Sequence, residues 1–225
     1  MIGALGVSEP DAGTDVASLR TTAERDGDDY IVNGSKLYIS NGTIADYITT
    51  AVRTGGPGHR GISVIVIPAD SEGLVRKRLQ KIGTHASDTA ELFFDNCRVP
   101  AENLIGQEND GFRLVMSGFE GERLVLSVIA CSQARLMFEE ARKWGHDRMA
   151  FGQSLLNFQV WQHRLADVLT NIEAAETLTY RAIECYVNGE EANSLISMAK
   201  LFSTEMALDT ARECAQIQGG LSHME

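Results

Sequence analysis

The first side chains with evident chemical potential lie near the start of this 225-residue chain, in the segment Gly-Val-Ser-Glu-Pro-Asp-Ala-Gly-Thr-Asp at residues 6–15. Ser8 offers a small hydroxyl, Glu9 is an acid held next to Pro10, and Thr14 follows a glycine. A loop of this composition offers N–H and hydroxyl donors, which suit a bound electron-rich group better than a packed core. From these residues alone, a surface turn rich in aspartate and glycine is the alternative.

Two further groups of residues carry aromatic, hydroxyl or carboxylate side chains that could belong to the same site as residues 6–15. Residues 38–42, Tyr-Ile-Ser-Asn-Gly, place an aromatic ring and a short hydroxyl at the expected end of a strand. An ordinary alternating strand has the same pattern, so the interpretation depends on the pairing with residues 6–15. Later in the chain, Glu120 and Glu122 are two carboxylates whose pattern, taken alone, favours the solvated start of a helix.

The overall composition excludes several classes of partner. The net charge is −11 and no lysine or arginine cluster offsets it, which argues against nucleic acid or an anionic membrane as a partner. We expect no signal peptide and no membrane span, and the five histidines share no metal-ligand spacing. Irregular spacing predicts reduced thiols rather than disulfides or a metal site for the four cysteines, Cys97, Cys131, Cys185 and Cys214.

The pattern of the chain changes from strands to helices near residue 107. Residues 19–106 contain short strand-like runs, with turns expected at Asp26-Gly27-Asp28 and Asn33-Gly34, and predict an all-β, barrel-like or sandwich domain. Residues 112–148, 158–187 and 190–217 predict three long helices of a bundle. We therefore predict a multidomain α+β protein with a β-domain at 1–107 and an incomplete helical domain at 108–225. The helical runs carry apolar residues at Leu124, Ile129, Leu136, Phe138, Trp161, Leu165, Val168, Ile172, Ala175 and Leu178.

Residues 6–15 resemble the flavin-binding signature of the acyl-CoA dehydrogenase family, and residues 38–42 resemble a second motif of that family in the correct order. The resemblance covers nearly the whole chain and implies the family's middle β-domain followed by its C-terminal helical domain. It also implies an interior fragment, in which the N-terminal helical domain and the end of the C-terminal domain are missing.

The resemblance implies that FAD is the cofactor and assigns contacts to it. Val7, Ser8 and Thr14 would bind the pyrimidine edge and the phosphates, while Tyr38, Ile39 and Ser40 would line the flavin ring. Arg148, Phe151 and Gln159 match residues that reach the FAD of a neighbouring subunit, so a homodimer or homotetramer is implied. Taken alone, Arg148 could be a helix-end arginine. The last matching group is Gln216, Gly219 and Gly220, although Leu221 replaces the usual aromatic residue and the glycines could form a helix cap.

The same resemblance identifies a catalytic base. Glu122 stands where isovaleryl-CoA and long-chain dehydrogenases carry a helix-borne glutamate, followed as in those enzymes by arginine and leucine. Most relatives instead carry the base on a loop that would lie beyond residue 225. Substrate contacts are implied for Thr14, Phe119, Glu120 and Arg123.

The implied reaction is the α,β-dehydrogenation of an acyl-CoA thioester to a trans-2-enoyl-CoA, with electrons passed to an electron-transfer flavoprotein. An acyl-CoA oxidase that uses oxygen, or a flavoprotein scaffold without catalysis, is the alternative. The helix-borne glutamate favours branched or longer acyl chains. We expect a cytoplasmic protein, or one of the mitochondrial matrix if the source is eukaryotic, and the isolated fragment could be inactive.

Overall fold

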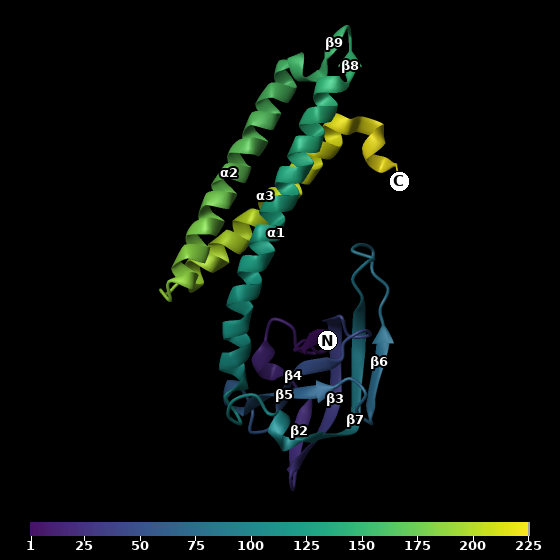
Figure 1. The fold of residues 1–225 in the computed structure, drawn as a ribbon, viewed down its shortest axis with the longest axis vertical. Coiled ribbons are helices and arrows are strands. Elements are labelled where there is room, and N and C mark those ends of the chain that lie inside the picture. Colours follow the sequence, from purple (N-terminus) through teal and green to yellow (C-terminus); the bar gives the residue numbers. More distant parts are fainter. Residues whose placement is uncertain (225) are drawn as a thin grey trace. The chain divides into compact units, whose positions relative to one another are not determined.

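The computed structural model describes residues 1–224, which form two compact units, residues 1–117 and 118–224 (Figure 1). The first unit contains the sheet and the second contains the helices, so the predicted order of an all-β part and a helical part is confirmed. The boundary between the units falls inside the first long helix, Gly111–Asp147, because the first residues of that helix pack on the sheet. A Cβ atom on Gly111 would lie 2.5 Å from the carbonyl carbon of Ser63. The domain limits predicted from the sequence, 1–107 and 108–225, stay a prediction.

Seven strands form one sheet in the first unit, in the order β1-β4-β2-β3-β7-β6, with β5 paired to β4. The ladders are antiparallel except where β4 pairs with β1 and β2. Tyr30, Val32, Ile48, Ile65 and Leu92 are fully buried in its core. The strands are β1 (Gly3–Gly6), β2 (Thr22–Asp26), β3 (Asp29–Ser40), β4 (Tyr47–Arg53), β5 (Ile62–Pro68), β6 (Leu74–Arg78) and β7 (Thr89–Pro100).

One of the two expected turns is confirmed and the other is wrong. Residues 26–29 join β2 to β3 in a tight hairpin, and Gly27 has φ 64°. At Asn33-Gly34, however, β3 continues and only its register against β7 shifts. Gly34 has φ 142°, and a Cβ there would lie 2.7 Å from the Cα of Thr21. This glycine therefore serves a bulge and a close backbone approach, which produce the same local sequence signal as a turn.

The three long helices that the sequence predicts are α1 (Gly111–Asp147), α2 (Gln159–Val187) and α3 (Asn193–Gln218). The second unit contains α1 from residue 118 onward and all of α2 and α3. Phe138 of α1 packs with Leu165, Val168 and Ile172 of α2, and α3 completes this core. Two short strands, β8 (Met149–Ala150) and β9 (Gln153–Ser154), join α1 to α2. Short 3-10 turns occur at Val16–Ser18, His59–Gly61, Ala101–Asn103, Leu155–Asn157 and Gly219–His223.

The four cysteines are free thiols, and Cys97, Cys131 and Cys214 are buried. Burial in apolar surroundings raises the pKa of the Cys214 thiol to about 11. These cysteines therefore act as small apolar core residues rather than as nucleophiles. Within residues 1–224, no helix is long and apolar enough to cross a membrane.

Candidate functional site

The loop at residues 7–15 and the end of β3 meet in the folded first unit. The backbone N–H of Leu37 donates to the carbonyl oxygen of Ser8 at 2.9 Å. The ammonium of Lys36 donates to the carbonyl oxygen of Val7 at 3.1 Å. The loop of the first sequence motif therefore lies beside the strand that leads into the second, although the two motifs are separate in the chain.

The side chains of these two segments divide into buried anchors and exposed donors. Val7 and Ile39 are buried, whereas Thr14 and Ser40 are exposed and Ser8 is half-buried. The exposed hydroxyls are available to a bound molecule, while the buried residues fix the backbone that carries them. Such a surface could hold a planar aromatic group with polar edges.

Tyr38 has an unusual backbone. Its φ is 62°, its side chain is 70% exposed, and the register of β3 against β7 shifts between Lys36 and Ile39. An aromatic residue in the left-handed region is strained, and such strain persists where the surrounding structure imposes it. The bulge turns the Tyr38 ring out of the ladder and into solvent.

The sequence interpretation missed the role of Glu9 and Lys36 in this site. Glu9 is only 8% exposed, so it belongs to the interior and not to an open donor loop. Its carboxylate accepts from the Lys36 ammonium at 2.7 Å and from the backbone N–H groups of Arg20 and Thr21 at 2.6 and 3.0 Å. A lysine among the apolar residues of a long strand was the signal that could have identified the pair.

The turn that follows Ser40 is held by two polar side chains. Asp88 accepts at 2.8 Å from the backbone N–H of Thr43 and at 2.5 Å from its hydroxyl. Hydrogen bonds from Thr43 hold the pKa of the Asp88 carboxyl below its ordinary value, although burial alone would raise it. Arg76 donates to the carbonyl oxygens of Gly42, Thr43 and Ala45. The end of β3 is therefore fixed on both sides.

In the second unit, the structure brings Arg148 together with the glycines of the C-terminal motif. Arg148, Gly219 and Gly220 line one hollow of about 430 Å³, together with Trp144 and Leu155. Arg148 follows the last residue of α1, and its backbone N–H donates to the carbonyl oxygen of Trp144 at 2.9 Å. An arginine beside accessible glycine backbone is an arrangement that can bind a phosphate.

The other predicted residues of this unit lie outside the lining of that hollow. Phe151 is 97% exposed, has φ 51° and lies edge-on to Phe158 with ring centroids 6.3 Å apart. Gln159 and Gln216 are also exposed. The cofactor-binding residues predicted in this unit therefore fall into two groups. Arg148, Gly219 and Gly220 line the hollow, and the exposed side chains of Phe151, Gln159 and Gln216 do not.

Glu122 lies on the exposed side of α1. Two positions later, Leu124 is buried against Ala182 of α2 and Ile196 of α3. Because two helical positions differ by about 200°, Glu122 faces away from these two helices. Phe119, Glu120 and Arg123 are half-buried. The Glu122 carboxylate is therefore accessible to a substrate.

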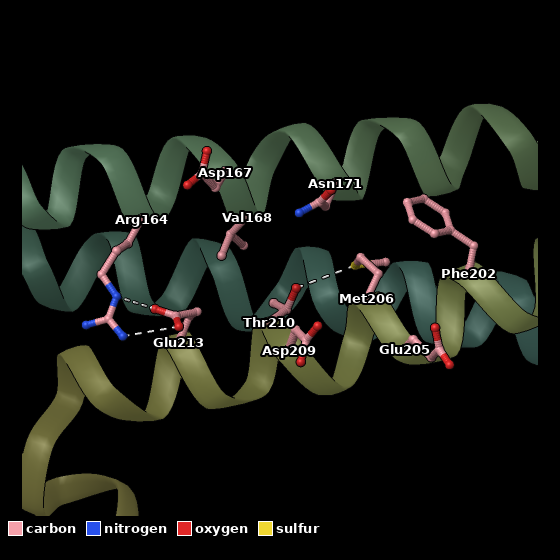
Figure 2. A pocket seen from close by; sticks show the side chains of 10 residues that line it. All are labelled: Arg164, Asp167, Val168, Asn171, Phe202, Glu205, Met206, Asp209, Thr210 and Glu213. Atoms are coloured by element: carbon pink, nitrogen blue, oxygen red, sulfur yellow. Dashed lines mark hydrogen bonds and ion pairs between the residues drawn. The ribbon is translucent and has the colours of Figure 1, made fainter.

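A second hollow, of about 300 Å³, lies between α2 and α3 (Figure 2). Figure 2 shows Arg164 paired with Glu213, with Nε and Oε2 2.6 Å apart, and the Thr210 hydroxyl donating to the sulfur of Met206. Three more carboxylates line it, those of Asp167, Glu205 and Asp209. It contains none of the residues that the sequence predicts for the site.

Two family models match the chain. The acyl-CoA dehydrogenase middle domain matches residues 4–97, and the acyl-CoA dehydrogenase C-terminal domain matches residues 109–225. The chain belongs to the acyl-CoA dehydrogenase family. This membership confirms the resemblance seen in the sequence. It also agrees with the arrangement of a sheet unit followed by a helical unit.

Similar proteins within the acyl-CoA dehydrogenase family extend this finding. Cyclohexane-1-carbonyl-CoA dehydrogenase of Geobacter metallireducens is 41% identical over 97% of the chain and 58% of its own length. The mitochondrial long-chain specific acyl-CoA dehydrogenase of Sus scrofa is 37% identical over 99% of the chain and 53% of its own length. A probable acyl-CoA dehydrogenase from Mycobacterium abscessus, known from a crystal structure, is 44% identical in sequence and matches the fold with a TM-score of 0.98. The match covers 100% of this chain and 60% of that protein's chain. The chain thus spans between half and three fifths of these relatives.

Proposed function

We propose that this protein catalyses the FAD-dependent α,β-dehydrogenation of an acyl-CoA thioester to the trans-2-enoyl-CoA. The observation that carries the proposal is the contact between the loop of Ser8 and the strand of Tyr38 and Ser40, through the Leu37–Ser8 hydrogen bond. Membership of the acyl-CoA dehydrogenase family supports the same reaction class.

The residues present fit a flavin. The hydroxyls of Ser8 and Ser40 are accessible donors at its polar edges, the exposed Tyr38 ring would shield one face, and the backbone near Val7 and Ile39 would fix the plane. The Thr14 hydroxyl would contact the FAD phosphates, whereas the Arg148 guanidinium would reach the pyrophosphate of a neighbouring subunit's FAD. Gly219 and Gly220 would let the backbone approach the cofactor closely. Phe151, Gln159 and Gln216 complete the proposed contacts. When bound, FAD would accept the hydride that leaves the substrate Cβ.

Glu122 is the proposed base. The thioester carbonyl acidifies the neighbouring Cα–H, and the Glu122 carboxylate would take that proton as the bond from Cβ to its hydrogen breaks. Its exposure on α1 supports this role because a base must reach the substrate. Arg123, Phe119, Glu120 and Thr14 would bind and orient the thioester.

The proposed electron acceptor is an electron-transfer flavoprotein. A solved structure described as an electron transferring flavoprotein of Acidaminococcus fermentans contains a chain 38% identical to this one, with a TM-score of 0.96. An oxidase is the second candidate, favoured by the 31% identical prolyl acyl carrier protein oxidase AnaB with a TM-score of 0.95. A dehydrogenase and an oxidase differ in whether an electron-transfer flavoprotein or oxygen accepts the electrons from the reduced flavin.

A homodimer or homotetramer is proposed because Arg148, Phe151 and Gln159 match residues that reach a neighbouring subunit's cofactor. The cytoplasm or the mitochondrial matrix is the proposed location, since the Sus scrofa relative is mitochondrial and the Geobacter relative is bacterial.

The test uses protein expressed from the complete gene, purified with FAD and titrated without oxygen against a panel of acyl-CoA thioesters. We expect bleaching of the oxidised flavin band by the substrate. Glu122→Gln should keep FAD and lower the bleaching rate by about 10²- to 10⁴-fold, the usual contribution of a general base. Glu140→Gln, at an exposed carboxylate of the same helix that has no proposed role, is the matched control and should retain most of the rate.

Each other outcome points to a different conclusion. A wild-type rate in Glu122→Gln would mean that another carboxylate is the base. Bound FAD that no thioester bleaches would favour a flavoprotein scaffold. Rapid oxygen consumption during turnover, without an added flavoprotein acceptor, would favour the oxidase.

A further inference from the structure

Lys36 and Glu9 form a buried ion pair in the first unit. Their side chains are 0% and 5% exposed, and Nζ of Lys36 lies 2.7 Å from Oε1 of Glu9. The carboxylate also accepts from the backbone N–H groups of Arg20 and Thr21. Every charged atom of the pair therefore has a partner inside the protein.

The pair lies between the two segments that carry the proposed flavin contacts. Lys36 is the last residue of β3 before the bulge that turns Tyr38 outward. Its ammonium also donates to the carbonyl oxygen of Val7, and the next residue donates to Ser8. Through Lys36, the loop of Val7 to Glu9 is attached to β3 at the bulge.

Stability alone does not account for such a pair. Removing two charges from water is costly, and well-packed apolar residues of similar volume often stabilise a fold as much or more. An apolar pair would lack the directional contacts from Nζ to Val7 and Glu9, so it would not fix the loop in one position.

We propose that Lys36 and Glu9 are positioning residues for FAD, which hold the loop of Ser8 and the bulge of Tyr38 at a fixed separation. This inference rests on the proposed function, because it concerns the same cofactor. Neither residue is assigned a contact with FAD. Both act through the backbone that they join.

The experiment compares Lys36→Met, Glu9→Gln and the double variant in protein from the complete gene. Three properties are measured: the dissociation constant of FAD, the visible circular dichroism of bound FAD, and Tm. Lys36→Met leaves the buried Glu9 carboxylate without a counter-charge, and Glu9→Gln does the same to the Lys36 ammonium. Tm therefore falls, and FAD binds at least about 10-fold more weakly. In the double variant no buried charge lacks its partner, so Tm recovers, while FAD binding stays weak and its dichroism stays altered.

Val99→Ala is the control for a general loss of stability. Val99 is fully buried and pairs with Tyr30, at the end of β3 that is remote from Ser40. This variant should lower Tm and leave the FAD dissociation constant and dichroism unchanged.

The inference is overturned if FAD affinity recovers together with Tm in the double variant, or if Val99→Ala weakens FAD binding equally at the same loss of Tm. Wild-type affinity in all Lys36 and Glu9 variants would overturn it as well. Failure of the wild-type protein to bind FAD would remove the proposed function itself, and with it this inference.

Discussion

The Glu9 carboxylate is buried and still keeps its charge, because Lys36, Arg20 and Thr21 all donate to it. Burial alone would raise the pKa of Glu9, but the Lys36 charge and these hydrogen bonds hold the pKa below its ordinary value. For Lys36, burial is the larger effect and lowers the pKa to about 8, against the opposing charge of Glu9. The two groups therefore share a charged state near neutral pH.

A pH-dependent stability follows from Lys36. Between pH 8 and pH 10.5 the folded lysine is neutral while the unfolded lysine is still protonated, so the unfolded chain binds more protons. The free energy of unfolding should therefore rise with pH across this range, relative to that of Lys36→Met. Calorimetric Tm values of both proteins, collected across the range, would check this. Parallel pH profiles would contradict it.

At the scale of elements, β3 has two irregularities with different functions. The bulge near Gly34 allows the strand to pass Thr21 closely, and the bulge after Lys36 turns Tyr38 outward. Both interrupt a strand that otherwise pairs with β7 along its length. β3 is therefore shaped for close packing at one point and for display of a side chain at the other.

Gly34→Ala tests the first irregularity against Gly27→Ala in the hairpin. A Cβ at Gly34 would lie 2.7 Å from the Cα of Thr21, whereas nothing lies within 4 Å at Gly27. We expect Gly34→Ala to destabilise by about 2–5 kcal/mol, from backbone strain and overpacking together. Gly27→Ala should cost about 1 kcal/mol, from backbone strain alone. Thermal unfolding of the two variants measures the difference, and equal losses would show that the approach to Thr21 is easily relieved.

At the scale of the whole molecule, α1 carries apolar side chains on its exposed side as well as on its buried side. α1 buries Leu124 and Phe138, but Ile129 and Leu136, which the sequence shows among charged residues, are 44% and 64% exposed. Other exposed apolar residues on this helix are Val125, Leu126 and Val128. A row of this kind on one helix is typical of a surface that another protein segment covers.

We expect the 225-residue chain, expressed as it stands, to bind the dye ANS and to self-associate. Replacing Ile129 and Leu136 together by lysine should reduce both dye fluorescence and association in light scattering. Gln133→Lys, at an exposed polar position of the same helix, is the control and should change neither. Unchanged dye binding in the double lysine variant would locate the exposed apolar surface elsewhere.

The amino-acid sequence by itself determined the family and the order of strands and helices, and it singled out the segments around Ser8, Tyr38 and Arg148 as candidates for the site. Periodicity and short motifs are local properties of a chain, so both can be read without the fold. Only the tertiary structure decided that Glu9 is buried against Lys36 and that Arg148 and Gly219 line the same hollow. It also showed that Asn33-Gly34 forms a bulge and that Ile129 is exposed. These features depend on strand register and helix packing, which bring together residues far apart in sequence, and no local pattern specifies such partners.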